Sequence, residues 1–152
     1  MRKFVLIIFI FLSACGYKSI YQNEISFNTI YSKIDFIGDK SINDKIINTL
    51  KFEEKKDMVE LNNLLISSDY KIEPASRNSK GQINSYKTTI NVKLETSDNK
   101  NKILLSKNFN KKFDYNKKDN NFDLVNYQNS IKDELLNQII GEIIIFFNSN
   151  DN

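Results

Sequence analysis

Alternation of apolar and polar residues dominates the middle of the chain. Residues 86–95 place apolar or small side chains on one side and polar side chains on the other, which predicts a strand in a sheet with one packed and one hydrated face. A turn-forming cluster at 97–101 separates it from a second alternating segment at 103–115. Lys107 and Lys111 interrupt the apolar positions of that segment. The two segments together predict a hairpin at the core of the sheet.

Two further strands are predicted nearer the N-terminus. Residues 30–36 place Ile30, Ile34 and Phe36 on one face. Residues 64–72 also alternate, and we expect this strand to end before Pro74, because proline cannot donate to a central ladder. Residues 58–66 fit either the start of this strand or an extension of the preceding helix. Residues 75–82 are expected to form a loop.

Two segments have the spacing of amphipathic helices. Ser41 followed by Asp44 gives a weak capping signal, and the next residues form an apolar stripe that ends at Leu50. The second helix is long: from residue 122 to 147, apolar residues recur at helical spacing. Residues 143–147 are apolar nearly all round. This end fits either a core helix lying across the sheet or a contact surface or membrane-facing tip.

The order of these elements is strand, helix, three strands, helix. It predicts an α+β fold, a two-layer sandwich in which two helices pack on one face of a four-stranded sheet. We assign residues 30–148 to this domain and residues 149–152 to a polar tail. The second sheet face, rich in Lys, Thr and Asn, is expected to be hydrated.

The N-terminus has the three parts of an export signal. Arg2 and Lys3 precede an apolar run at 4–12, followed by Ser13, Ala14 and Cys15. The order resembles a bacterial lipoprotein signal, which implies a signal peptide at 1–14, acylation of Cys15 and a lipidated tether at 15–29. An ordinary secretory signal with an incidental cysteine is one alternative. An uncleaved membrane helix is another, but nine apolar residues fall short of the ~20 that span a bilayer.

Composition narrows the classes of function. Without Arg2 and Lys3 the mature chain has 20 basic residues against 19 acidic ones, so net charge does not favour nucleic-acid binding. Cys15 is the single cysteine and there is no histidine, which argues against a disulfide, a zinc or iron–sulfur site and His-dependent catalysis. Glu53 and Glu54 are adjacent acids best interpreted as surface residues. We expect neither enzymatic activity nor a cofactor or metal.

Residues 15–21, Cys-Gly-Tyr-Lys-Ser-Ile-Tyr, resemble the Cys-Gly-aromatic start of the LPS-assembly lipoprotein family LptE, especially its shorter alphaproteobacterial type. Residues 86–94, the partner strand ending near residues 113–115 and the long final helix carry the rest of the resemblance. It covers nearly the whole mature chain. Residues 51–69 carry no family signal, so the register of the second strand stays open.

The resemblance implies a lipoprotein of the outer membrane, anchored on the periplasmic side. Such a protein plugs the barrel of LptD, assists barrel folding and helps deliver lipopolysaccharide (LPS) to the cell surface. It also implies that basic loop residues at one end of the sandwich contact LPS, and Arg77, Lys117 and Lys118 match such loops. Their side chains could form charge-assisted hydrogen bonds to lipid A phosphates. The alternative for each residue is a solvated loop charge.

A second class of function is also compatible with the sequence. A periplasmic lipoprotein that is auxiliary to a transporter, or a small lipid-binding module, would show the same signal and the same order of elements. A stable monomer that binds a lipid without any barrel partner would favour this alternative. An envelope-anchored hydrolase is the third possibility, for which the sequence offers only carboxylate pairs.

Overall fold

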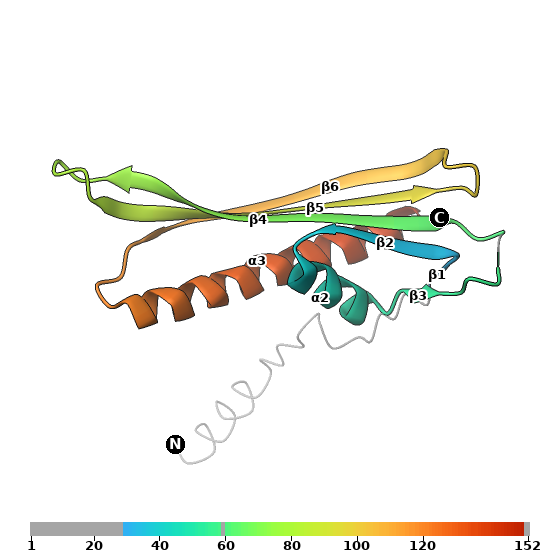
Figure 1. Cartoon of the computed structure of the whole chain (residues 1–152), viewed down its shortest axis with the longest axis horizontal. Helices are drawn as coiled ribbons and strands as arrows, with labels where there is room; N and C mark the ends of the chain where they lie inside the picture. Colours follow the sequence, from blue (N-terminus) through green and yellow to red (C-terminus); the bar gives the residue numbers. More distant parts are fainter. Residues whose placement is uncertain (1–28, 59, 151–152) are drawn as a thin grey trace, which may run out of the picture.

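The computed structural model describes residues 29–58 and 60–150 (Figure 1). The signal peptide at 1–14, Cys15 and the tether up to residue 28 lie outside this part of the chain. The described residues form six strands and two helices. The strands are β1 (Ile30–Tyr31), β2 (Lys33–Gly38), β3 (Glu53–Glu54), β4 (Asn63–Arg77), β5 (Ile83–Ser97) and β6 (Ile103–Asn116). The helices are α2 (Lys40–Leu50) and α3 (Asn121–Asn150).

The main sheet has four strands in the order β2-β4-β5-β6. β2 pairs with β4 in parallel, and the remaining pairs are antiparallel. Both helices lie on one face of this sheet (Figure 1), so the expected two-layer α+β sandwich is confirmed. The register of the second strand is now defined, with Leu64 opposite Thr96 in β5. A small parallel pair, β1 with β3, was not expected.

The core lies between the sheet and the two helices. On β5, the alternating residues Thr88, Ile90, Val92 and Leu94 are all at most 2% exposed, which confirms the predicted packed face. The apolar stripes of both helices supply the facing side chains. They include Ile42, Ile46, Leu50, Leu136, Ile139 and Ile143. Full burial of each such side chain contributes about 1.5–3 kcal/mol, so these two stripes hold the layers together.

The start of α2 differs from the sequence prediction. Asp39 is the N-cap, and its Oδ1 accepts a hydrogen bond from the backbone N–H of Ile42 at 3.0 Å. Ser41 already lies inside the helix and is exposed. The predicted Ser41–Asp44 capping signal is therefore wrong. Gly38, whose φ is +93°, turns the chain sharply at the end of β2. The N-cap therefore falls at Asp39, two residues before the predicted Ser41.

The prediction that β4 ends before Pro74 is also wrong. The strand continues to Arg77, and Pro74 pairs with Tyr86 of β5. The Ser68 carbonyl accepts from the Asp39 N–H, so it points away from β5. Alternation along the strand directs the Pro74 nitrogen to that same side. β2 has ended by Pro74, so the missing N–H costs no ladder hydrogen bond.

The first predicted strand is split and only partly packed. Ser32 separates β1 from β2, and its N–H donates to the Asn62 carbonyl at 2.9 Å. Tyr31 and Ile34 are buried, whereas Phe36 is 49% exposed. Phe36 was expected on the packed face, but β2 is an edge strand with a neighbour on one side only.

The C-terminal end of α3 packs on the sheet as a core helix. The Phe146 ring meets Phe109 of β6 at 6.0 Å between centroids, and the Phe147 ring meets Phe52 at 5.7 Å. Ile143 is fully buried, while Ile145 is 68% exposed. The helix continues to Asn150, so it includes the first part of the predicted polar tail. No helix within the described residues is long and apolar enough to cross a membrane.

Candidate functional site

The three basic residues singled out in the sequence lie at one end of the main sheet. Arg77 is the last residue of β4, and the Lys117 N–H donates to the carbonyl of Asn84 in β5 at 2.9 Å. β5 lies between their strands, so their backbones are separated by about two strand spacings, roughly 10 Å. Lys118 follows directly. We refer to Arg77, Lys117 and Lys118 as the basic cluster. This placement agrees with the loops at one end that the LptE resemblance implies, and contact of these residues with LPS stays a prediction.

Arg77 is held by its own hairpin. Its Nη1 donates to the Gly81 carbonyl at 2.8 Å, across the turn that joins β4 to β5. Asn78 closes this turn, because its Oδ1 accepts from the backbone N–H groups of Lys80 and Gln82. Arg77 was expected in a loop, but it ends a strand, which orients it more strongly. The remaining guanidinium donors stay available to an anion.

Lys118 rests on an aromatic side chain. Its Nζ lies 4.9 Å from the centroid of the Tyr127 ring in the first turns of α3. Tyr127 meets Tyr115 edge to face at 5.6 Å, and Tyr115 stacks on Tyr86 at 5.8 Å. No member of the basic cluster forms an ion pair with a described residue. Their charges are therefore not neutralised locally, as an anion site requires.

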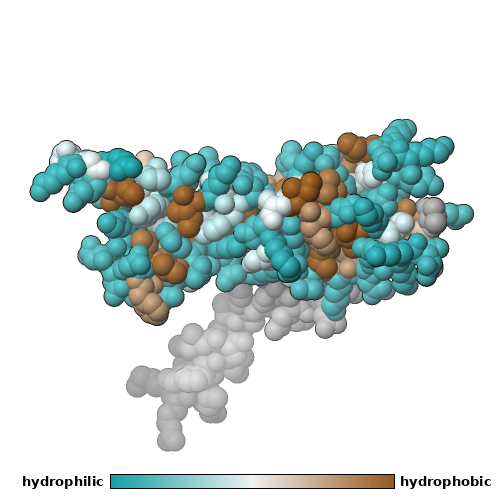
Figure 2. Space-filling model, viewed as in Figure 1, coloured by the Kyte–Doolittle hydropathy of each residue, from teal (hydrophilic) through white to brown (hydrophobic). Residues whose placement is uncertain are grey.

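Exposed apolar side chains lie near this end as well. Phe113 on β6 and Phe122 and Val125 on α3 are 44%, 71% and 46% exposed. Apolar atoms gather where α3 begins (Figure 2). The sequence analysis did not single out these residues. Val125 falls outside the apolar stripe of the helix, and this position was a signal that its side chain would be exposed. Cations beside apolar surface suit an amphiphile that has both phosphate and acyl groups.

A partly buried ion pair joins the helices beneath the sheet. Lys132 of α3 lies 3.1 Å from Asp39 Oδ2 and 4.7 Å from the centroid of the Tyr70 ring. Burial acts to raise the pKa of Asp39, but the Ile42 N–H and the Lys132 ammonium outweigh it and lower the pKa. Burial, with Tyr115 and Asp39 nearby, raises the pKa of Tyr70. No local pattern in the sequence indicates this ion pair, because Asp39 and Lys132 are 93 positions apart along the chain.

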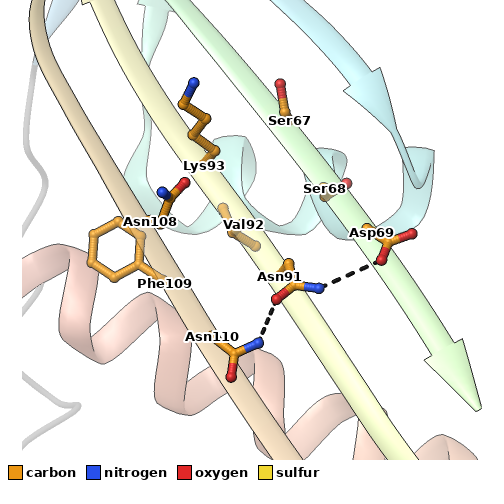
Figure 3. A pocket seen from close by; sticks show the side chains of 9 residues that line it. All are labelled: Ser67, Ser68, Asp69, Asn91, Val92, Lys93, Asn108, Phe109 and Asn110. Atoms are coloured by element: carbon orange, nitrogen blue, oxygen red, sulfur yellow. Dashed lines mark hydrogen bonds between the residues drawn. The ribbon is translucent and has the colours of Figure 1, made fainter.

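The face of the sheet away from the helices is polar, as expected. A groove of about 430 Å³ runs across it, with side chains from β4, β5 and β6 (Figure 3). Asn91 Nδ2 donates to Asp69 Oδ2 at 3.4 Å, and Asn110 Nδ2 donates to Asn91 Oδ1. These three residues form a row across the strands, which we refer to as the amide row.

The acidic side chains in the described part of the chain form no metal-binding arrangement. No group of three or more Cys, Asp or Glu side chains converges within the described residues. Glu54 of the adjacent Glu53–Glu54 pair accepts from the Ile34 N–H at 3.1 Å, so it stabilises the start of β2. Glu53 is its neighbour on a two-residue strand, where successive side chains point to opposite faces. Both residues are thus explained by local structure.

Comparisons with known proteins place this fold. No protein-family model matches the sequence, and no curated protein matches it significantly. Among solved structures, rare lipoprotein B from Shewanella oneidensis superposes with a TM-score of 0.59 at 9% identity, over 78% of this chain and 96% of that one. Lipoprotein B from Nitrosomonas europaea, described as uncharacterized, superposes with a TM-score of 0.55 at 11% identity, over 85% of this chain and 88% of that one. A candidate lipoprotein from Caulobacter crescentus gives 0.51 at 10% identity over 75% and 86%.

The chain therefore has the fold of a group of small bacterial lipoproteins. Rare lipoprotein B is LptE-like, so the fold agrees with the LptE resemblance of the sequence. At these identities the likeness concerns the fold alone.

Proposed function

We propose that this protein is an LptE-type outer-membrane lipoprotein, acylated on Cys15 and anchored on the periplasmic side. It plugs and assists assembly of an LptD-type barrel and helps deliver LPS to the cell surface, without catalytic turnover. The observation that carries this proposal is the shared fold with LptE-like rare lipoprotein B, which extends over 96% of that chain. The lipoprotein-like N-terminus of the sequence supports it independently.

The surface of the domain is compatible with a plug. The lumen of a membrane barrel is polar, so a plug needs a hydrogen-bonding exterior. The outer sheet face meets this need through the amide row and through ion pairs such as Lys71–Asp69 and Lys93–Glu95. Most of the visible surface is hydrophilic (Figure 2).

The two ends of the sandwich have different roles in this proposal. The described chain enters at the end where Asn63 pairs with Ser97, and the basic cluster lies at the opposite end (Figure 1). β4 spans 15 residues between them, or about 50 Å. A lipid anchor on Cys15 would be joined to the domain at the first end. The basic cluster would meet LPS at the other end of the sandwich.

Affinity purification of the tagged full-length protein from detergent-solubilised envelopes tests this function. We expect a large β-barrel protein to copurify in near equal amounts. Recovery of the protein as a monomer that binds lipid without a barrel would contradict the plug and favour a lipid-binding module or transporter auxiliary. A Cys15→Ser form is the control, because it shows whether the barrel copurifies only through the lipid attached to Cys15.

A further inference from the structure

The two edges of the main sheet are built differently. The β2 side carries the usual protection against further strand pairing: β2 has only six residues, Pro74 lies on the uncovered part of β4, and the register shifts after Pro74. β6 is 14 residues long and has no proline. Its pairing with β5 is regular from Thr96 to Ser85. No described strand pairs with its other side.

The backbone of β6 presents its free hydrogen-bonding groups through a defined set of residues. The Lys117 N–H bonds to Asn84, so it points towards β5. Backbone groups alternate in direction along an antiparallel strand. The N–H and C=O groups of Asn108, Asn110 and Lys112 therefore point outward, along the open edge. Their side chains are exposed and belong to the outer sheet face.

The amide row ends at this same edge. Each amide nitrogen in it donates towards β4: Asn110 to Asn91, and Asn91 to Asp69. The Asn110 oxygen points away from the row (Figure 3) and accepts no hydrogen bond from a described residue. A hydrogen-bond donor on one more strand would extend the row by another step.

Lysines protect the edge less than their number indicates. Lys107 and Lys111 belong to the inner face and are engaged by α3: the Lys107 ammonium lies 5.6 Å from the Phe146 ring centroid, and Lys111 pairs with Glu142. Lys112 is on the outer face and has no ion pair among the described residues. One unpaired positive charge thus sits directly beside the outward backbone groups.

We infer that β6 accepts an extended segment of another protein as a fifth strand. The segment carries a hydrogen-bond donor such as Asn, Ser or Thr opposite Asn110 and a carboxylate near Lys112. Its alternate residues are apolar, to cover exposed Phe113 on the helix side. Main-chain pairing supplies the affinity, and the side chains set the register. This surface is separate from the basic cluster, so the inference does not depend on LPS binding.

A synthetic peptide of about twelve residues tests the inference, since this is a common strand length with added ends. It alternates valine with threonine and carries glutamate at two threonine positions; a matched peptide carries lysine there. Binding is measured by fluorescence anisotropy on the full chain in detergent. We expect the glutamate peptide to bind at least about tenfold more tightly than the lysine peptide. Equal binding of both would overturn the proposed chemistry.

Asn108 offers a matched pair of variants, because its side chain forms no hydrogen bond with a described residue and its N–H points outward. Asn108→Pro removes that N–H and should weaken peptide binding by about tenfold, while Asn108→Ala should stay within about twofold. Circular dichroism checks that both fold. Equal binding by the two variants would refute strand addition, and a dimer abolished by Asn108→Pro would make a second copy the occupant instead.

Amide hydrogen exchange on the unmodified protein gives an independent readout. In the free protein, the outward amides of Asn108, Asn110 and Lys112 should exchange fast, and those of Phe109 and Lys111 slowly. The glutamate peptide should slow the first group by at least about tenfold. No protection at saturating peptide would overturn the inference, whatever the variants show.

Discussion

Gly38 and Asp39 form the joint between β2 and α2 and show how single residues fix the fold. A Cβ at Gly38 would lie 1.7 Å from the Ser68 carbonyl oxygen, and the φ of +93° disfavours other residues. Asp39 caps the helix, its N–H donates to Ser68 and its carboxylate binds Lys132. One residue thus connects β4 with both helices.

Replacement of Gly38 by alanine should be severe. Gly38→Ala combines a backbone collision with left-handed strain, so we expect the free energy of unfolding to fall by more than about 3 kcal/mol. Gly81→Ala is the matched control: its φ is +79°, but nothing lies within 4 Å of the new Cβ. Backbone strain alone should lower the free energy of unfolding of Gly81→Ala by about 1–2 kcal/mol. Urea unfolding measures both, and equal losses would contradict the collision argument.

The lowered pKa of Asp39 predicts a dependence of stability on pH. A carboxyl whose pKa is lower in the folded state stabilises the fold above its unfolded pKa of about 4, and this contribution is lost as the pH falls through the folded pKa. Asp39→Asn keeps a capping oxygen but removes the charge. It should be less stable than the wild type at neutral pH, and the difference should shrink in acid. Asp44→Asn, in an exposed pair with Lys40, is the control.

The basic cluster can be tested by charge removal. Simultaneous Arg77→Ala, Lys117→Ala and Lys118→Ala should weaken LPS binding by at least about tenfold, because several charge-assisted hydrogen bonds are lost. The melting temperature should change little, since these side chains are exposed. Lys51, Lys55 and Lys56, replaced together by alanine, give the same change of charge elsewhere. Unchanged LPS binding by the first triple variant would reject the site and leave the plug proposal intact.

At the scale of elements, α3 unites the fold by packing one continuous stripe under β5 and β6. Its polar contacts follow the same line, since Lys111 pairs with Glu142 and Lys107 lies over Phe146. The two lysines that interrupt the apolar pattern of β6 are explained in this way. They sit at the border of the helix, where their stems pack and their charges reach a partner.

Two isoleucines of α3 allow the effect of a buried side chain on stability to be compared with that of an exposed one. Ile139 is fully buried and Ile145 is 68% exposed. Ile139→Ala should lower the free energy of unfolding by about 2–5 kcal/mol through lost burial and a cavity, and Ile145→Ala by less than about 0.5 kcal/mol. Chemical denaturation compares them. A large loss at Ile145 would show that this side chain is covered in solution.

At the scale of the whole molecule, the sandwich is polarised along its length. The described chain starts at one end, and the basic cluster, the tyrosines beneath it and exposed apolar side chains lie at the other (Figure 1). The open β6 edge runs between the two ends. In the proposed function the two ends serve attachment to the lipid anchor and contact with LPS, and we infer separately that the β6 edge binds a protein partner.

Lipid attachment at Cys15 is a prediction for the whole molecule, because it decides where the domain works. Mass spectrometry of the mature N-terminus should find an acylated Cys15. Cys15→Ser removes the acyl chains, several of which hold a protein at a membrane far more strongly than one. This variant should therefore move most of the protein from the membrane to the soluble fraction. A mature N-terminus without acyl groups would contradict the outer-membrane assignment.

The sequence by itself determined the two-layer architecture, the β5–β6 hairpin and the stripe of α3. Each depends on local periodicity, which burial enforces: alternation follows from a sheet with one covered face, and helical spacing from one packed stripe. It also placed Lys117 and Lys118 in a polar break after the second hairpin strand. That Arg77 shares their end of the sandwich was implied by the LptE resemblance.

Only the tertiary structure decided the features that need neighbours distant in sequence. Pro74 is tolerated inside β4 because β2 ends before it, and Phe36 is exposed because β2 is an edge. Asp39 and Lys132 are 93 positions apart, so no local pattern could join them. Which edge of the sheet stays open is likewise a property of strand order in space, where hydrogen bonds are satisfied or left free.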